Sequence, residues 1–155
     1  METIEHLRLL FDYDDWANRR TIATLRETTS DRSLQILAHV LITKQEYFDR
    51  LAGRDSTGFD FWPPLAIDDC EQLFRSTQEQ YSRLLDGAND DLLDHTASYK
   101  TSEGILYENS YRELLTHVLF HSSIHRGNIV LKMREEGLKP PMIDYIVYLR
   151  ETDNG

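Results

Sequence analysis

Residues 110–136 carry an apolar stripe with the spacing of an α-helix, and two histidines interrupt that stripe. The side chains recur three or four residues apart, which places them on one face of a helix. A helix with such a face needs other apolar surfaces to pack against. The segment therefore predicts a helical protein in which two imidazoles face the interior. The stripe consists of Leu114, Val118, His121, His125 and Ile129.

Four further segments have helical spacing, and turn residues separate them. We expect helices over residues 3–26 and 31–52, a third from Asp68 to just before Gly87, and a short helix over residues 143–150. Residues 95–108 break the helical pattern, which indicates a small hairpin or irregular insertion. The predicted fold is all-α, an antiparallel four-helix bundle with this insertion before the fourth helix and a short C-terminal helix.

Capping motifs are expected at the start of the last two long helices. Asp68 with Glu71 and Ser110 with Glu113 have the three-residue spacing of a capping box. In that motif each side chain accepts a hydrogen bond from the backbone of the other residue.

Polar residues on the first predicted helix leave two interpretations open. Asp14 and Asn18 fall on its apolar stripe. Either the stripe drifts and leaves them at its edge, or it borders a polar site, because buried polar groups need partners.

The loop over residues 54–67 contains Phe59, Phe61 and Trp62. We expect this loop to fold back on the body or on a partner, in preference to serving as a substrate lid.

Length and charge limit the function. The 155 residues predict one domain, residues 1–155. A net charge of −10 argues against a nucleic-acid partner, because such binding depends on basic patches. Cys70 is the only cysteine, so no intramolecular disulfide can form, which fits a reducing compartment. With no signal-peptide pattern and no apolar run long enough for a membrane span, we expect a cytoplasmic protein.

His121 and His125 have the spacing of two ligands to one metal ion. Side chains four apart on a helix lie one above the other. His39 and His117 compete as the third ligand. His117 and His125 are two turns apart, roughly 12 Å along the axis, whereas metal–nitrogen bonds are about 2.0–2.1 Å. This geometry favours His39, and three protein ligands with an open position are typical of reactive sites. We expect His6 and His95 at the surface.

Small residues follow His121 in the sequence. Ser122, Ser123 and Gly127 occupy little volume. We expect them to let a neighbouring helix approach the histidine face closely.

Four segments of the chain have motifs that occur together, in this order, in one known family. They are spread along nearly the whole chain, and they are Tyr13-Asp-Asp-Trp16-Ala17-Asn18, Ile36-Leu-Ala-His39 followed by Glu46, His117-Val-Leu-Phe-His121-Ser-Ser-Ile-His125-Arg126-Gly127-Asn128, and Asp144-Tyr-Ile-Val-Tyr-Leu-Arg150. The chain thereby resembles the DinB/YfiT-like family of metal-binding helical bundles. The resemblance implies a four-helix bundle, a three-histidine site for a divalent metal and a homodimer.

The resemblance also implies roles for individual residues. Its metal ligands fall on His39, His121 and His125, which leaves His117 as a structural residue or one that contacts the ligands. Asn128 departs from the family, which prefers Gln at this position, and the roles of Asn128 and Asn18 stay open.

Characterised relatives include metal-dependent thiol S-transferases and isomerases that use a low-molecular-weight thiol. We expect a metal-dependent enzyme of the thiol S-transferase type, with a small-molecule substrate and a small thiol. The alternatives are a metal-dependent hydrolase and a non-catalytic, stress-associated metal-binding protein. Three imidazoles suit zinc or nickel first, with iron or copper as alternatives. Cys70 matches no ligand motif, and we expect it to pack in the interior.

Overall fold

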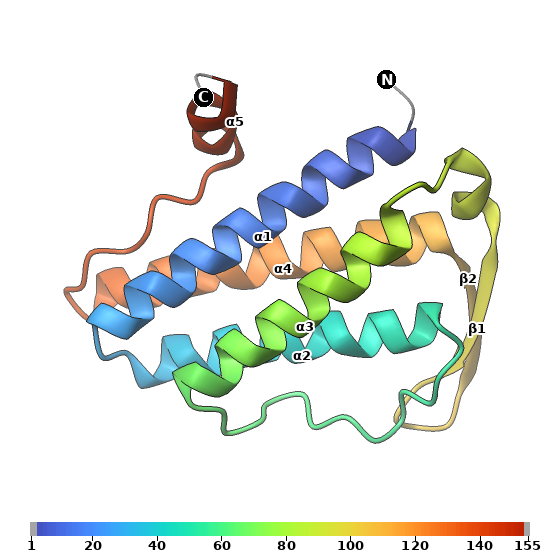
Figure 1. Ribbon diagram of the computed structural model, residues 1–155. Helices are drawn as coiled ribbons and strands as arrows, with labels where there is room; N and C mark the ends of the chain where they lie inside the picture. The colour runs from blue at the N-terminus through green and yellow to red at the C-terminus, as the bar shows by residue number, and fades with distance from the viewer. Residues whose placement is uncertain (1–2, 154–155) are drawn as a thin grey trace.

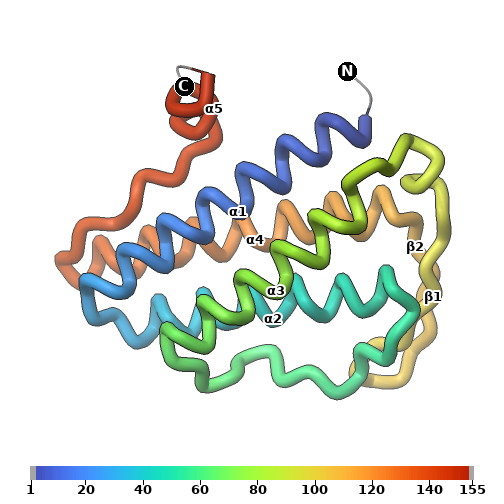
Figure 2. Tube along the Cα trace, in the orientation of Figure 1, coloured from blue at the N-terminus to red at the C-terminus, as the bar shows by residue number. Residues whose placement is uncertain are grey.

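The structure is a computed structural model that describes residues 3–153, so residues 1, 2, 154 and 155 of the expected domain lie outside it. It is mostly helical, with one antiparallel two-stranded sheet, as the sequence predicted (Figure 1, Figure 2). The elements are α1 (Thr3–Glu27), α2 (Asp31–Leu51), α3 (Ile67–Leu85), a 3₁₀ helix (Asp90–Asp94), β1 (Thr96–Lys100), β2 (Leu106–Ser110), α4 (Tyr111–Glu135) and α5 (Tyr145–Asp153).

The four long helices pack lengthwise against one another. α2 contacts both α3 and α4, and α1 also contacts α3 and α4. The hairpin of β1 and β2 lies at the end of the molecule where α2 finishes and α4 begins (Figure 1). α5 follows a long connection after α4 and contacts α1 (Figure 1). Among residues 3–153, none of the helices combines the length and apolar character needed to cross a membrane.

Two apolar clusters fill the interior, one toward each end of the long helices. The cluster near the hairpin includes Phe11, Tyr81 and Leu115. The cluster at the opposite end includes Leu37 and Met133. Along every long helix the residues of one cluster are separated in sequence from those of the other. The helices therefore have a middle level that neither cluster fills.

A buried charged network occupies this middle level. Asp14 and Asn18 of α1, Lys44 of α2 and Arg126 of α4 are all buried. The Asp14 carboxylate accepts a hydrogen bond from Lys44 Nζ (2.9 Å) and another from Arg126 Nη1. Arg126 Nη1 also donates to Asn18 Oδ1 (3.0 Å). Asp14 and Asn18 thus form a polar site of their own, and the interpretation that they sit at the edge of the stripe is wrong.

Electrostatics keep this network ionised. Burial alone would raise the pKa of Asp14, but Lys44 and Arg126 hold the pKa of this carboxyl below its usual value. The pKa of Lys44 is raised: burial works against its charge, and Asp14 and Asp15 outweigh that effect. Charges removed from water remain charged here because each has an opposite charge within hydrogen-bonding distance.

The helix starts agree with the sequence for α4 and disagree for α3. Ser110 Oγ accepts from the Glu113 N–H (3.2 Å) and the Glu113 carboxylate accepts from the Ser110 N–H (2.9 Å), which confirms the predicted capping box. The capping box predicted for α3 is wrong. α3 begins at Ile67, and the carboxylates of Asp68 and Glu71 bind Arg26 of α1. The local cap comes instead from Asp69, whose carboxylate accepts from the Ala66 N–H (3.0 Å).

The small residues of α4 only partly meet the expectation that a neighbouring helix packs closely against them. Ser122 is buried, but Gly127 is exposed, and no atom from another part of residues 3–153 lies within 4 Å of a Cβ placed on it, so no helix approaches closely there. In α5, Ile146 is 50% exposed, whereas Tyr148 is 8% exposed. The Tyr148 ring lies 5.4 Å from that of Trp16 in α1. α5 therefore packs on α1 through Tyr148, which contacts an aromatic side chain of α1.

We predict that Asp14→Ala lowers the free energy of unfolding by about 3–5 kcal/mol, because it leaves the buried Arg126 without its carboxylate and the buried Lys44 with Asp15 alone. Urea titration followed by circular dichroism measures this loss. Glu79→Ala is the matched control, since it removes an exposed ion pair with Arg83 on α3 and should change little. A loss below about 1 kcal/mol for Asp14→Ala would show that the network does not hold the helices together.

Candidate metal centre

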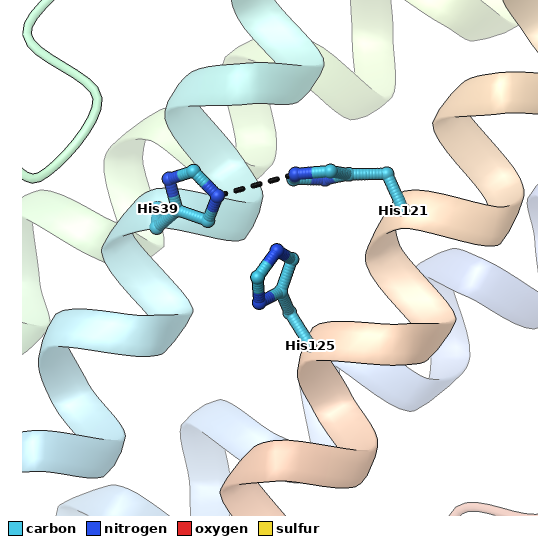
Figure 3. A group of neighbouring side chains, drawn as sticks. All are labelled: His39, His121 and His125. Carbon is cyan, nitrogen blue, oxygen red and sulfur yellow. Dashed lines mark hydrogen bonds between the residues drawn. The ribbon is translucent and has the colours of Figure 1, made fainter.

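Three histidines from two helices converge beside the middle level of the structure. His121 and His125 project from successive turns of α4, and His39 projects toward them from α2 (Figure 3). One ring nitrogen from each histidine can be chosen so that all three atoms lie within 4.8 Å of one another. His39 is buried, and the other two are half-buried. The structure thus brings together the three residues that the sequence singled out.

The distance between two of these nitrogens suits a shared ion. His39 Nε2 lies 3.1 Å from His121 Nε2. Two ligands on a tetrahedral ion with bonds of about 2.0 Å would lie about 3.3 Å apart. The third imidazole, His125, directs a ring nitrogen toward the same space (Figure 3). The donor set and its spacing therefore fit a divalent metal ion of the zinc type.

The loop between α2 and α3 orients His39. His39 Nδ1 lies 2.6 Å from the backbone oxygen of Phe61. A carbonyl oxygen can only accept, so Nδ1 carries the proton and Nε2 has a free lone pair facing α4. Hydrogen bonds of this kind commonly set the orientation and tautomer of metal-binding histidines.

An aromatic ring from the same loop covers His39. Trp62 stacks on the imidazole with 4.0 Å between ring centroids and 7° between ring planes. The expectation that the aromatic loop folds back on the body is confirmed. Its contact with the site was missed: the sequence signal was the run of aromatics in the loop, but nothing in the sequence says which surface they meet.

Burial keeps the α4 imidazoles neutral. The pKa of His121 is lowered to about 4, mainly because burial disfavours its charged form and also because His125 and His39 lie close by. The pKa of His125 is lowered by burial and then by His39. Both rings are therefore uncharged at neutral pH, the state in which a lone pair can bind a metal.

His117 and Asn128 lie near this group without joining it. The His117 ring is 4.7 Å from that of Tyr47 and 5.8 Å from that of His121, and it is not one of the three converging residues. Asn128 places its amide 3.4 Å from His125 Nδ1. The shorter amide of this chain therefore still reaches the histidine at its second nitrogen. His6 and His95 are exposed, as predicted.

A cavity of about 360 Å³ adjoins the histidines. It lies between α2, α4 and the turn of the hairpin, so a small molecule that enters it would meet two of the three imidazoles. Its lining includes His39, Thr43, Glu46, Arg50, His117 and His121.

Cys70 is not a candidate nucleophile. It is fully buried in the apolar cluster far from the hairpin, as expected for a packing residue. Burial and the nearby Asp69 raise the pKa of its thiol to about 11. A thiolate is the reactive form of cysteine, so this side chain is inert at neutral pH.

Two comparisons with known proteins agree with this description. A sequence model of the DinB family matches residues 4–155. Protein DinB of Bacillus subtilis (strain 168) is 26% identical over 162 aligned residues, which cover 92% of this chain and 93% of that protein.

Proposed function

The chain belongs to the DinB family, and we propose that it holds one divalent metal ion through His39, His121 and His125. The observation that carries this proposal is the convergence of three ring nitrogens within 4.8 Å. Zinc and nickel are the first candidates, since both accept imidazole ligands. The antiparallel four-helix bundle expected for the chain is part of the proposal, because the packing of α2 on α4 brings the histidines together.

We further propose that the metal centre serves an enzyme of the thiol S-transferase type, with a small thiol as cosubstrate. A divalent ion held by neutral ligands keeps its charge and lowers the pKa of a thiol or a water at its open position. The chain contributes an oriented His39, two neutral imidazoles on α4 and the adjoining cavity. Since Cys70 is inert, the sulfur must come from a second molecule. A reducing, cytoplasmic location belongs to the same proposal.

We predict that the purified protein binds one divalent ion and transfers a small thiol to an electrophile only when loaded. Alanine at His39, His121 or His125 should lower metal content severalfold and abolish transfer, because only two imidazoles would remain to bind the ion. His117→Ala is the matched control for metal binding on the same helix and should keep its metal content. Elemental analysis gives the metal content, and loss of free thiol in the presence of an alkylating electrophile gives the activity.

The outcomes separate the alternatives. Hydrolysis of esters or amides by the loaded protein without thiol transfer would favour the hydrolase. Metal binding with neither activity would favour a non-catalytic metal-binding protein. Full metal content in His39→Ala together with loss in His117→Ala would show that the third ligand is misassigned.

We also propose that the protein forms a homodimer through the outer face of α4. Three large apolar side chains on this helix are exposed, namely Phe120 (66%), Ile124 (65%) and Leu131 (57%). Their spacing places Phe120 and Ile124 on adjacent turns of one face. Beside them an apolar cavity of about 260 Å³ lies between α1 and α4. Exposed apolar side chains that cluster in this way commonly mark protein interfaces.

We predict a dimer mass for the wild type in light scattering and a monomer mass for a Phe120→Ser/Ile124→Ser double variant. The substitutions remove apolar area from the outer face and leave the histidines in place. Leu106→Ser, at an exposed apolar residue of β2, is the control and should leave the mass unchanged. A wild-type mass that stays monomeric at all concentrations would contradict the proposal.

A further inference from the structure

The cavity beside the histidines contains buried polar atoms that lack hydrogen-bond partners. Glu46 is 3% exposed and Thr43 is 5% exposed, and both line the cavity. Glu46 Oε2 and Thr43 Oγ1 have no partner among the described residues. A buried polar group left unpaired lowers stability, and most such groups in proteins find a partner. These atoms therefore indicate a binding function.

Arg50 determines which oxygen of Glu46 is available. Arg50 Nη2 lies 3.4 Å from Glu46 Oε1, and Arg50 Nε donates to Ser56 Oγ (3.1 Å). The guanidinium also lies 4.7 Å from the centre of the Tyr47 ring and 4.4 Å from that of Tyr99. Because these contacts hold the guanidinium in place, one carboxylate oxygen is engaged and the other remains a free acceptor.

The two unpaired groups lie in line with the metal ligand on α2. Thr43 and Glu46 follow His39 by four and seven residues, a spacing that keeps all three on one face of the helix. The helical rise separates them from His39 by roughly 6 Å and 10 Å along the axis. A molecule bound at the histidines and extending toward the hairpin would therefore pass Thr43 and then reach Glu46.

We propose that Glu46, with Thr43, is a subsite for a cationic amino group on the small thiol, so that the preferred cosubstrate is an aminothiol. The inference rests on the proposed metal-dependent function. Burial raises the pKa of Glu46, and Arg50 opposes this shift. A bound ammonium group, which only donates hydrogen bonds and is positively charged, would favour the ionised carboxylate, which only accepts them. Arg50, the cationic side chain that lines the cavity, is already engaged by Glu46, Ser56 and two tyrosine rings.

The test compares two thiols that differ at one end, cysteamine and 2-mercaptoethanol. Their affinities for the cobalt-loaded protein are measured by calorimetry or by the visible absorption of the ion, in wild type and in Glu46→Gln. We expect the preference for cysteamine to fall roughly tenfold in Glu46→Gln, the range for a charge-assisted hydrogen bond. Differences in thiol acidity or chelation cancel when the wild-type ratio is divided by the variant ratio.

Further variants keep the test decisive. Glu79→Gln, an exposed change on α3, should leave the ratio unchanged. Thr43→Val should lower it a few-fold, and it carries the test if Glu46→Gln fails to fold or to take up metal. Metal uptake and thiol binding with the same ratio in wild type and both cavity variants would overturn the subsite alone. Failure of the wild type to take up metal would overturn the metal centre and the subsite with it.

Discussion

The ion pairs of Asp14 with Lys44 and Arg126 are the constraint on which the rest of the structure depends. They join α1, α2 and α4 at one level, between two apolar clusters that would tolerate sliding or rotation of the helices. Buried charges leave little freedom, because a charge separated from its partner is strongly destabilising. Arg126 follows His125 directly in α4. The network therefore sets the rotation of the helix that presents the α4 histidines.

Next to this network, α2 and α4 also carry the three histidines of the candidate metal centre. In the network the charged groups pair with one another, so none is left to bind a ligand. The three imidazoles instead direct ring nitrogens at a common space. The Phe61 carbonyl completes this arrangement from a loop by giving His39 a single tautomer. Beyond the histidines, Glu46 keeps one oxygen unpaired at the cavity wall. Along α2 the structure thus offers, in order, a place for a metal, a cavity and an acceptor for a ligand.

Local patterns in the sequence predicted much of this molecule. The helices, the Ser110 cap and the pairing of His121 with His125 follow from spacing along single segments. His39 is favoured as the third ligand because His117 lies too far from His125 on the same helix and because the chain resembles a known family. Contacts between segments could not be predicted in this way. Asp68 has the right spacing for a cap but binds Arg26 of α1, and Trp62 meets His39 across the fold. Such contacts depend on how helices are placed, which spacing along one helix does not record.

X-ray absorption spectroscopy of the metal-loaded protein tests the central claim most directly, because it reports the atoms bound to the ion. The account predicts three imidazole nitrogens at about 2.0–2.1 Å with one light, exchangeable ligand. Adding a small thiol should replace that ligand with sulfur at about 2.3 Å. A shell of carboxylate oxygens, or one with no exchangeable position, would contradict it.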